Sequence, residues 1–199
     1  DRYCDSVNSL SLSIIINSLY IPGIASSSFG KQTIASGDYA NAFGERSEAR
    51  GRSSMVSGER NRANGRASMA SGLLSLAQGA GSFAQGLLAQ SYGSGGFASG
   101  IMARSFGEGS GALGISSFAA GFSSFANGLN VRANLGIANF ASGANSQASG
   151  RLASAAFNLN TTAGGSASAS FGNGTLTKAE TSFVIGRNNA IEVNASNSF

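Results

Sequence analysis

The chain has 199 residues, of which 29 are glycine and only one is proline, and it contains no tryptophan or histidine. Alanine and serine are abundant, and side chains this small suit a thin interior in which backbones approach closely, not the wide space between packed helices. The net charge of +4 is modest, and no nucleic-acid-binding module is recognisable, so we expect no nucleic-acid partner.

Residues 1–23 form the first predicted segment, and they have the alternating pattern of a strand. The alternating apolar positions are Leu10, Leu12, Ile14 and Ile16. Such a strand would either cap the first coil of the following domain and shield its edge, or be donated to a neighbouring assembly to build a filament. Cys4 is then either an idle thiol or an interchain disulfide at that joint. The apolar run is too short and too polar to cross a bilayer, so we expect no direct membrane insertion.

Residues 24–186 form the second predicted segment, which is a repeat. Glycine recurs at every seventh position from 23 to 128 and, after a one-residue insertion, continues to 186. Phe157 is expected to replace one glycine, and a second insertion is expected between residues 164 and 172. An internal repeat this regular predicts a solenoid.

Within each seven-residue unit, we number the glycine as the seventh place. The third and fifth places hold mainly serine and alanine, so the third, fifth and seventh places are expected to form one inner face with the period of a strand. The fourth place, on the opposite face, differs between alternate units. The sequence therefore predicts an all-β, parallel β-solenoid, or β-roll, with 14-residue coils of two unlike 7-residue units, stacked about 4.8 Å apart. Residues 187–199 lack the glycine and are expected to form a cap or tail.

The fourth place of every other unit is mainly apolar. This predicted stripe consists of Met55, Met69, Phe83, Phe97, Phe125 and Phe140. Because the stripe faces away from the thin interior, a monomer would expose it as a long apolar patch. Burying each phenylalanine would contribute about 1.5–3 kcal/mol. We therefore expect chains to associate along the stripe, and three rods around an axis would enclose it in a homotrimer.

Charge is concentrated between residues 45 and 66. The arginines of this patch are Arg46, Arg50, Arg52, Arg60, Arg62 and Arg66. The 14-residue coil would stack Glu48 on Arg62, which favours structural salt bridges between subunits. The alternative is a threefold-repeated basic site for a polyanion or an acidic host surface.

We expect no enzymatic activity from this chain. It lacks histidine, and no serine has an identifiable base that would activate it as a nucleophile. Regularly spaced aspartates, which a calcium-binding β-roll needs, are also missing. We therefore predict no catalytic residues, no cofactor and no metal site.

Several segments resemble the head repeats of trimeric autotransporter adhesins of the YadA type, whose motif Asn-Ser-Val-Ala-Ile-Gly-x-x-Ser recurs near every fourteenth residue. The matching segments are Ser68–Ser75, Ser82–Gly86, Ser117–Ser124 and Ser182–Gly186. The resemblance covers residues 24–186. It implies a left-handed roll, a homotrimer, display at the cell surface or on an extracellular appendage, and binding to a matrix protein or cell-surface ligand.

The sequence also departs from that family. Phenylalanine or methionine stands where the family usually has valine, which implies a wider or differently packed trimer axis. The stalk heptads and membrane-anchor strands of the family are not expected within residues 187–199. Similar rolls occur in phage tail fibres, so the second hypothesis is a structural subunit of an extracellular fibre, spore or phage appendage. Such a subunit would join further copies of itself end to end through its N-terminal strand.

Overall fold

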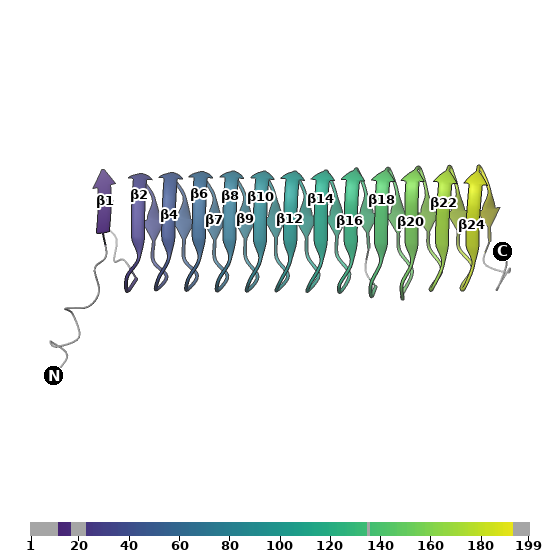
Figure 1. Ribbon diagram of the computed structural model, residues 1–199, viewed down its shortest axis with the longest axis horizontal. Coiled ribbons are helices and arrows are strands. Elements are labelled where there is room, and N and C mark those ends of the chain that lie inside the picture. The colour runs from purple at the N-terminus through teal and green to yellow at the C-terminus, as the bar shows by residue number, and fades with distance from the viewer. Residues whose placement is uncertain (1–11, 17–22, 135, 193–199) are drawn as a thin grey trace, which may run out of the picture.

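The computed structural model describes residues 12–16, 23–134 and 136–192, and it shows an all-β rod of stacked coils (Figure 1). Each coil contributes one five-residue strand and one two-residue strand, as in β6 (Met55–Glu59) and β7 (Arg62–Ala63). The five-residue strands form a 13-stranded sheet, here called sheet 1, and the two-residue strands form a 12-stranded sheet, called sheet 2. No helix that could span a membrane is found among these residues.

Both sheets run the length of the rod. Sheet 1 consists of β1 (Leu12–Ile16), β2 (Ser27–Lys31), β4 (Asn41–Glu45), β6 (Met55–Glu59), β8 (Met69–Leu73), β10 (Phe83–Leu87), β12 (Phe97–Ile101), β14 (Gly111–Ile115), β16 (Phe125–Leu129), β18 (Phe140–Ala144), β20 (Ala155–Leu159), β22 (Ala169–Asn173) and β24 (Phe183–Arg187). Sheet 2 consists of β3 (Ile34–Ala35), β5 (Glu48–Ala49), β7 (Arg62–Ala63), β9 (Leu76–Ala77), β11 (Gln90–Ser91), β13 (Arg104–Ser105), β15 (Phe118–Ala119), β17 (Arg132–Ala133), β19 (Gln147–Ala148), β21 (Thr162–Ala163), β23 (Leu176–Thr177) and β25 (Ala190–Ile191).

The predicted 14-residue repeat is confirmed by the register of the sheets. All the strand pairs are parallel, and from β2 to β16 each residue faces the residue fourteen positions further on, as Phe83 faces Phe97. Beyond β16, the partners are fifteen residues apart at two steps, from Phe125 to Phe140 and from Phe140 to Ala155, as they also are between β1 and β2. In both coils the extra residue lies in the turn from sheet 2 to sheet 1.

The prediction for the second insertion is wrong. Asn158, not Phe157, is the Cα partner of Gly143 and Gly172 in the glycine column. The extra residue therefore precedes β20 and does not lie between residues 164 and 172. Asn158 has a φ of 85°, and asparagine tolerates positive φ better than most residues, so it can replace glycine at this bend.

The space between the two sheets is thin because the side chains that fill it are small. Fifth-place alanines of both sheets, such as Ala70, Ala77 and Ala84, are fully buried, and Val56 is one of the largest buried side chains. Third-place serines lie between them, and several form hydrogen bonds along the rod, whereas the Ser54 and Ser82 hydroxyls have no partner among the described residues. Ser75, for example, donates its Oγ hydrogen to the Gly86 carbonyl oxygen of the next coil at 3.0 Å. These bonds satisfy polar groups that would otherwise be costly to bury.

The prediction that every seventh-place glycine faces the interior is correct for only half of the coil. Gly65, which follows a sheet 2 strand, is buried, and a Cβ there would lie 2.0 Å from the Gly79 carbonyl oxygen. Gly58, in a sheet 1 strand, is exposed and has a φ of +107°, because the strand bends there toward the next turn. The backbone of the next coil excludes a side chain at both places, but only the bend also requires positive φ.

The N-terminal strand predicted by alternation is present as β1, which pairs in parallel with β2 and extends sheet 1 by one strand (Figure 1). This pairing matches the capping role within one chain. Leu10 and Cys4 lie outside the described residues. At the other end, β25 pairs with β23 and lies beyond the last glycine of the series.

Candidate functional site

The six residues of the predicted stripe lie in one column on the outer face of sheet 1, outside the interior of the chain. They occupy the first position of β6, β8, β10, β12, β16 and β18. Met55 and Phe97 are 40% and 39% exposed, and the other four are half-buried. The rings of Phe83 and Phe97 stack with centroids 5.1 Å apart, so the column is ordered even where it meets solvent.

The stripe continues along the whole of sheet 1, because the strands that lack a large side chain at the fourth place carry one in a neighbouring column. Where the fourth place is small, the sixth place, on the same face two residues later, carries the large side chain. These pairs are Ser27 with Phe29, Asn41 with Phe43, Gly111 with Leu113, Ala155 with Phe157, and Ala169 with Phe171. Every strand of sheet 1 from β2 to β24 thus presents a large apolar side chain on its outer face, and β24 presents two, Phe183 and Ile185.

Sequence reasoning missed this complementarity because it followed the fourth place alone. A phenylalanine or leucine two residues after each small fourth place was the available signal. The columns meet at the C-terminal half, where Phe140 stacks on Phe157 with centroids 5.1 Å apart and Phe157 on Phe171 at 4.5 Å. We call the fourth- and sixth-place columns of β2 to β24 the apolar face.

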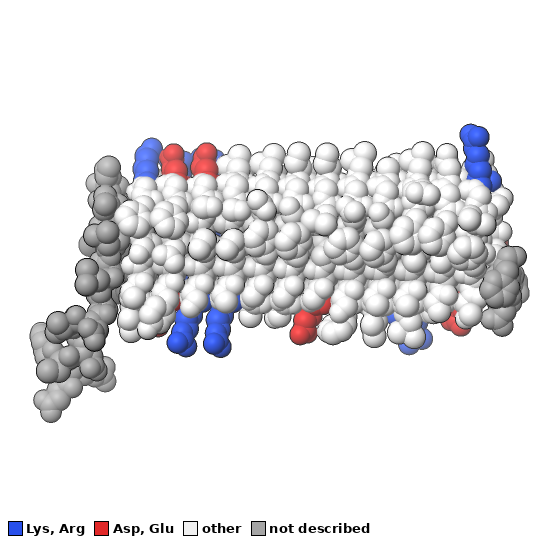
Figure 2. All heavy atoms as spheres, in the orientation of Figure 1, with Lys and Arg blue, Asp and Glu red and all other residues white. Residues whose placement is uncertain are grey.

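The apolar face carries no charged residue in either of its columns. Figure 2 shows this side of the rod with the charged atoms of the described residues along its two long edges. A face of this length without charge is unusual on a soluble monomer, because charged residues are depleted mainly at the centres of protein interfaces.

A second apolar column follows the edge of this face and was also missed. The residue after each sheet 1 glycine is leucine or isoleucine over much of the rod, and each is exposed. The members are Leu73, Leu87, Ile101, Ile115, Leu129 and Leu159. The recurrence of leucine or isoleucine after every second glycine was its signal. We call this column the apolar edge.

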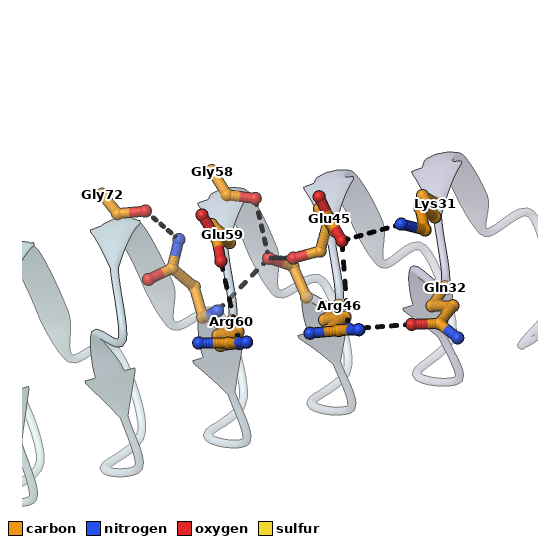
Figure 3. Close-up of polar contacts among 10 residues, drawn as sticks. Lys31, Gln32, Glu45, Arg46, Gly58, Glu59, Arg60 and Gly72 are labelled. Atoms are coloured by element: carbon orange, nitrogen blue, oxygen red, sulfur yellow. Dashed lines mark hydrogen bonds and ion pairs between the residues drawn. The ribbon is translucent and has the colours of Figure 1, made fainter.

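The same edge is charged in the first coils (Figure 3). Lys31 Nζ lies 3.3 Å from Glu45 Oε1, and Arg46 Nε donates to Gln32 Oε1 at 2.9 Å. Arg60 Nε lies 3.7 Å from Glu59 Oε1 in the next coil. Like-charged Arg46 and Arg60 stack on each other, and each has a glutamate beside it to offset the repulsion.

The predicted opposite-charge pair of Glu48 and Arg62 is confirmed on sheet 2. Arg62 Nε lies 3.3 Å from Glu48 Oε2, and Arg50 Nη2 lies 2.9 Å from the same oxygen. The Glu48 side chain is only 16% exposed, so this cluster is better shielded from solvent than the ion pairs on the edge.

The six arginines of the predicted patch do not form one site. Arg46 and Arg60 lie on the edge where sheet 1 turns into sheet 2, and Arg50 and Arg62 lie on the outer face of sheet 2. Arg52 and Arg66 follow the sheet 2 glycines, at the opposite edge, and neither forms an ion pair within the described part of the chain. Residues that are close in sequence therefore lie on three different surfaces of the coil, namely its two edges and the outer face of sheet 2.

No group of three His, Cys, Asp or Glu side chains that could hold a metal ion occurs in residues 12–16, 23–134 and 136–192. The extended features of the described residues are three surfaces: the apolar face, the apolar edge, and the outer face of sheet 2, which carries both charged and aromatic side chains. In the comparisons with known proteins, the chain matches no protein-family model and no curated protein.

Proposed function

We propose that this chain is the non-enzymatic head of a homotrimeric adhesin, displayed outside the cell, which attaches to a host or matrix surface. The observation that carries the proposal is the apolar face, which runs from β2 to β24 with a large apolar side chain in each strand and no charge. The resemblance to YadA-type head repeats adds the left-handed roll and the display outside the cell.

The energetics of the rod support association along this face. The interior consists of alanine and serine, and such small groups bury little apolar area per residue. Each phenylalanine covered by a neighbouring chain would add about 1.5–3 kcal/mol. Three rods would enclose their apolar faces around an axis, whereas two flat rods would leave the apolar edges in water.

The proposal leaves sheet 2 on the outside of the assembly. Its outer face is mixed in character, with Glu48, Arg62, Gln90, Arg104 and Phe118 in one column. A surface of this kind suits recognition of a ligand, because charged and aromatic groups at defined positions confer specificity.

Light scattering on the purified chain tests the assembly. We expect a mass three times that of the 19.8 kDa chain. Phe97→Asp places a charge on the apolar face and should yield a folded monomer, because an unpaired charge in an apolar interface is expensive. Gln90→Asp, the matched change at the fourth place of sheet 2, should leave the mass unchanged. A wild-type monomer at micromolar concentration would refute the trimer.

Binding to immobilised matrix proteins and to intact cells tests the adhesin role. The trimer should bind in a saturable way, and the Phe97→Asp monomer should bind far more weakly because avidity is lost. A stable trimer that binds neither matrix proteins nor cells would contradict the adhesin function while leaving the assembly intact.

The second candidate is a structural subunit of an extracellular fibre, spore or phage appendage. The specific observation in its favour is β1, a separate strand that extends sheet 1 at one end of the rod, while β24 is the last described strand of sheet 1 at the other end. A strand donated to the open edge of a neighbouring rod would use the same parallel pairing. Electron microscopy of concentrated protein discriminates: end-to-end filaments favour this candidate, and isolated short rods favour the adhesin.

A further inference from the structure

A hollow on the outer face of sheet 2 combines aromatic and basic side chains. It consists of two adjoining cavities, of about 400 and 540 Å³, and Phe118 and Asn134 line both. The cavities lie midway along the rod, on the sheet opposite the apolar face. This position leaves the hollow open in a single chain and in the proposed trimer alike.

One side of the hollow is an aromatic wall. The ring of Phe106 stacks on that of Tyr92 with centroids 4.6 Å apart and meets Phe118 at 5.4 Å with a tilt of 45°. Ala120, fourteen residues after Phe106, lines the same cavity and is too small to cover the ring. Phe106 therefore remains 42% exposed, with its ring at the side of the hollow.

The other side is basic, and the described residues that line the hollow include no acidic one. Arg104 and Arg132 are the Cα partners of Phe118 in the preceding and the following coil, so their backbones lie two strand spacings, or about 9.6 Å, apart. Both arginines are exposed, and neither forms an ion pair within the described ranges. Arg62, in the same column, is by contrast neutralised by Glu48.

We propose that this hollow binds an acidic saccharide, with a sugar ring against Phe106 and Phe118 and its carboxylate groups held by Arg104 and Arg132. Planar guanidinium groups bind carboxylates through paired hydrogen bonds, and the uncompensated positive charge selects an anion. An aromatic wall accepts the C–H face of a sugar ring, and the Asn134 amide can bond to its hydroxyls. The separation of the two arginines favours an oligosaccharide with repeated acidic groups over a single small anion.

This inference deepens the proposed function, since it names the ligand class of the adhesin and rests on that role. The site itself lies on one chain and does not require the trimer. Because the same surface would be repeated three times, the trimer would bind a long acidic polysaccharide more tightly than one site could.

Isothermal titration calorimetry with a hyaluronan hexasaccharide, which carries alternating carboxylates, tests the site on the full chain. We expect saturable binding that weakens with added salt, and no heat from a neutral cello-hexaose. Arg104→Gln combined with Arg132→Gln should weaken binding at least tenfold, and Phe106→Ala should do so as well. Arg62→Gln, the matched change in the same column, should leave the affinity within twofold of the wild type.

Three outcomes would overturn the inference. The first is absence of binding by folded wild-type protein. The second is equal loss on Arg62→Gln, or full affinity in Phe106→Ala, since either would reduce the site to general positive charge. The third is a change of mass in the Phe106 or arginine variants, which would make the hollow a contact between chains. Light scattering on the same samples keeps this test separate from the trimer: a monomer that binds the hexasaccharide refutes the assembly only.

Discussion

Sheet 1 and sheet 2 are built on the same interior, and they differ in what they present outward. Fifth-place alanines such as Ala84 and Ala77 are fully buried in both. On the outside, the fourth and sixth places of the sheet 1 strands carry large apolar side chains and no charge, whereas the two-residue strands of sheet 2 carry Glu48, Arg62, Arg104 and Arg132.

The difference shows how a solenoid separates stability from recognition. The inner places are restricted to small residues by the close approach of neighbouring coils, so they can specify little beyond the fold. The outer places stack in columns with a period of one coil, and each column can change along the rod. The edge column changes in this way from Lys31, Glu45 and Glu59 to Leu73 and Leu87.

The largest expected effect breaks the interior that the two sheets share. In Gly65→Ala the new Cβ would lie 2.0 Å from the Gly79 carbonyl oxygen, so the coils must move apart. We expect a loss of at least about 3 kcal/mol in the free energy of unfolding, measured by denaturant titration followed by circular dichroism.

Gly81→Ala is the matched control for that variant. Gly81 has a φ of +63°, but a Cβ there would have no neighbour within 4 Å. The expected loss is only about 1–2 kcal/mol, the strain of a left-handed conformation. Equal losses in the two variants would show that the approach of the next coil adds nothing to the cost of a side chain at residue 65.

An intermediate effect sharpens the account of sheet 1. Phe83→Ser should weaken trimerisation by about 1.5–3 kcal/mol per chain, because it leaves β10 without its large apolar group. Adding Gln85→Phe moves the ring to the sixth place, the arrangement of Asn41 and Phe43 in β4, and should restore association. Sedimentation equilibrium over a dilution series measures both. If the double variant associates no better than the single one, association requires a large side chain at the fourth place of β10, and a large side chain elsewhere in the same strand does not replace it.

The smallest effect concerns the charges of sheet 2. Glu48→Gln removes the carboxylate shared by Arg50 and Arg62 and should reduce stability by about 1 kcal/mol at low salt. Glu59→Gln, whose side chain is 49% exposed, should change it by less than about 0.5 kcal/mol. Chemical denaturation in low and high salt compares them, and a Glu48 effect that does not shrink with salt would argue against an ionic origin.

Much of the fold was predictable because it depends on local spacing. Glycine at every seventh position, with serine and alanine at alternate places, is compatible with a strand and not with a helix, and the difference between alternate units implies a coil of two strands. The partner of each residue then follows from adding fourteen, as for Glu48 and Arg62.

Other features depend on how the coil bends, which linear spacing does not describe. The bend at Gly58 turns that glycine outward and exposes the residue after it, so the leucines and isoleucines that recur after these glycines could be recognised as an exposed edge only in three dimensions. Asn158 could be assigned to the glycine column only from its strand partners. From the sequence, an insertion before residue 158 and an insertion after residue 164 both bring the seven-residue spacing to Gly172. The column of Arg104, Phe118 and Arg132 follows from adding fourteen twice, but only the packing of side chains around it shows that the two arginines border one hollow.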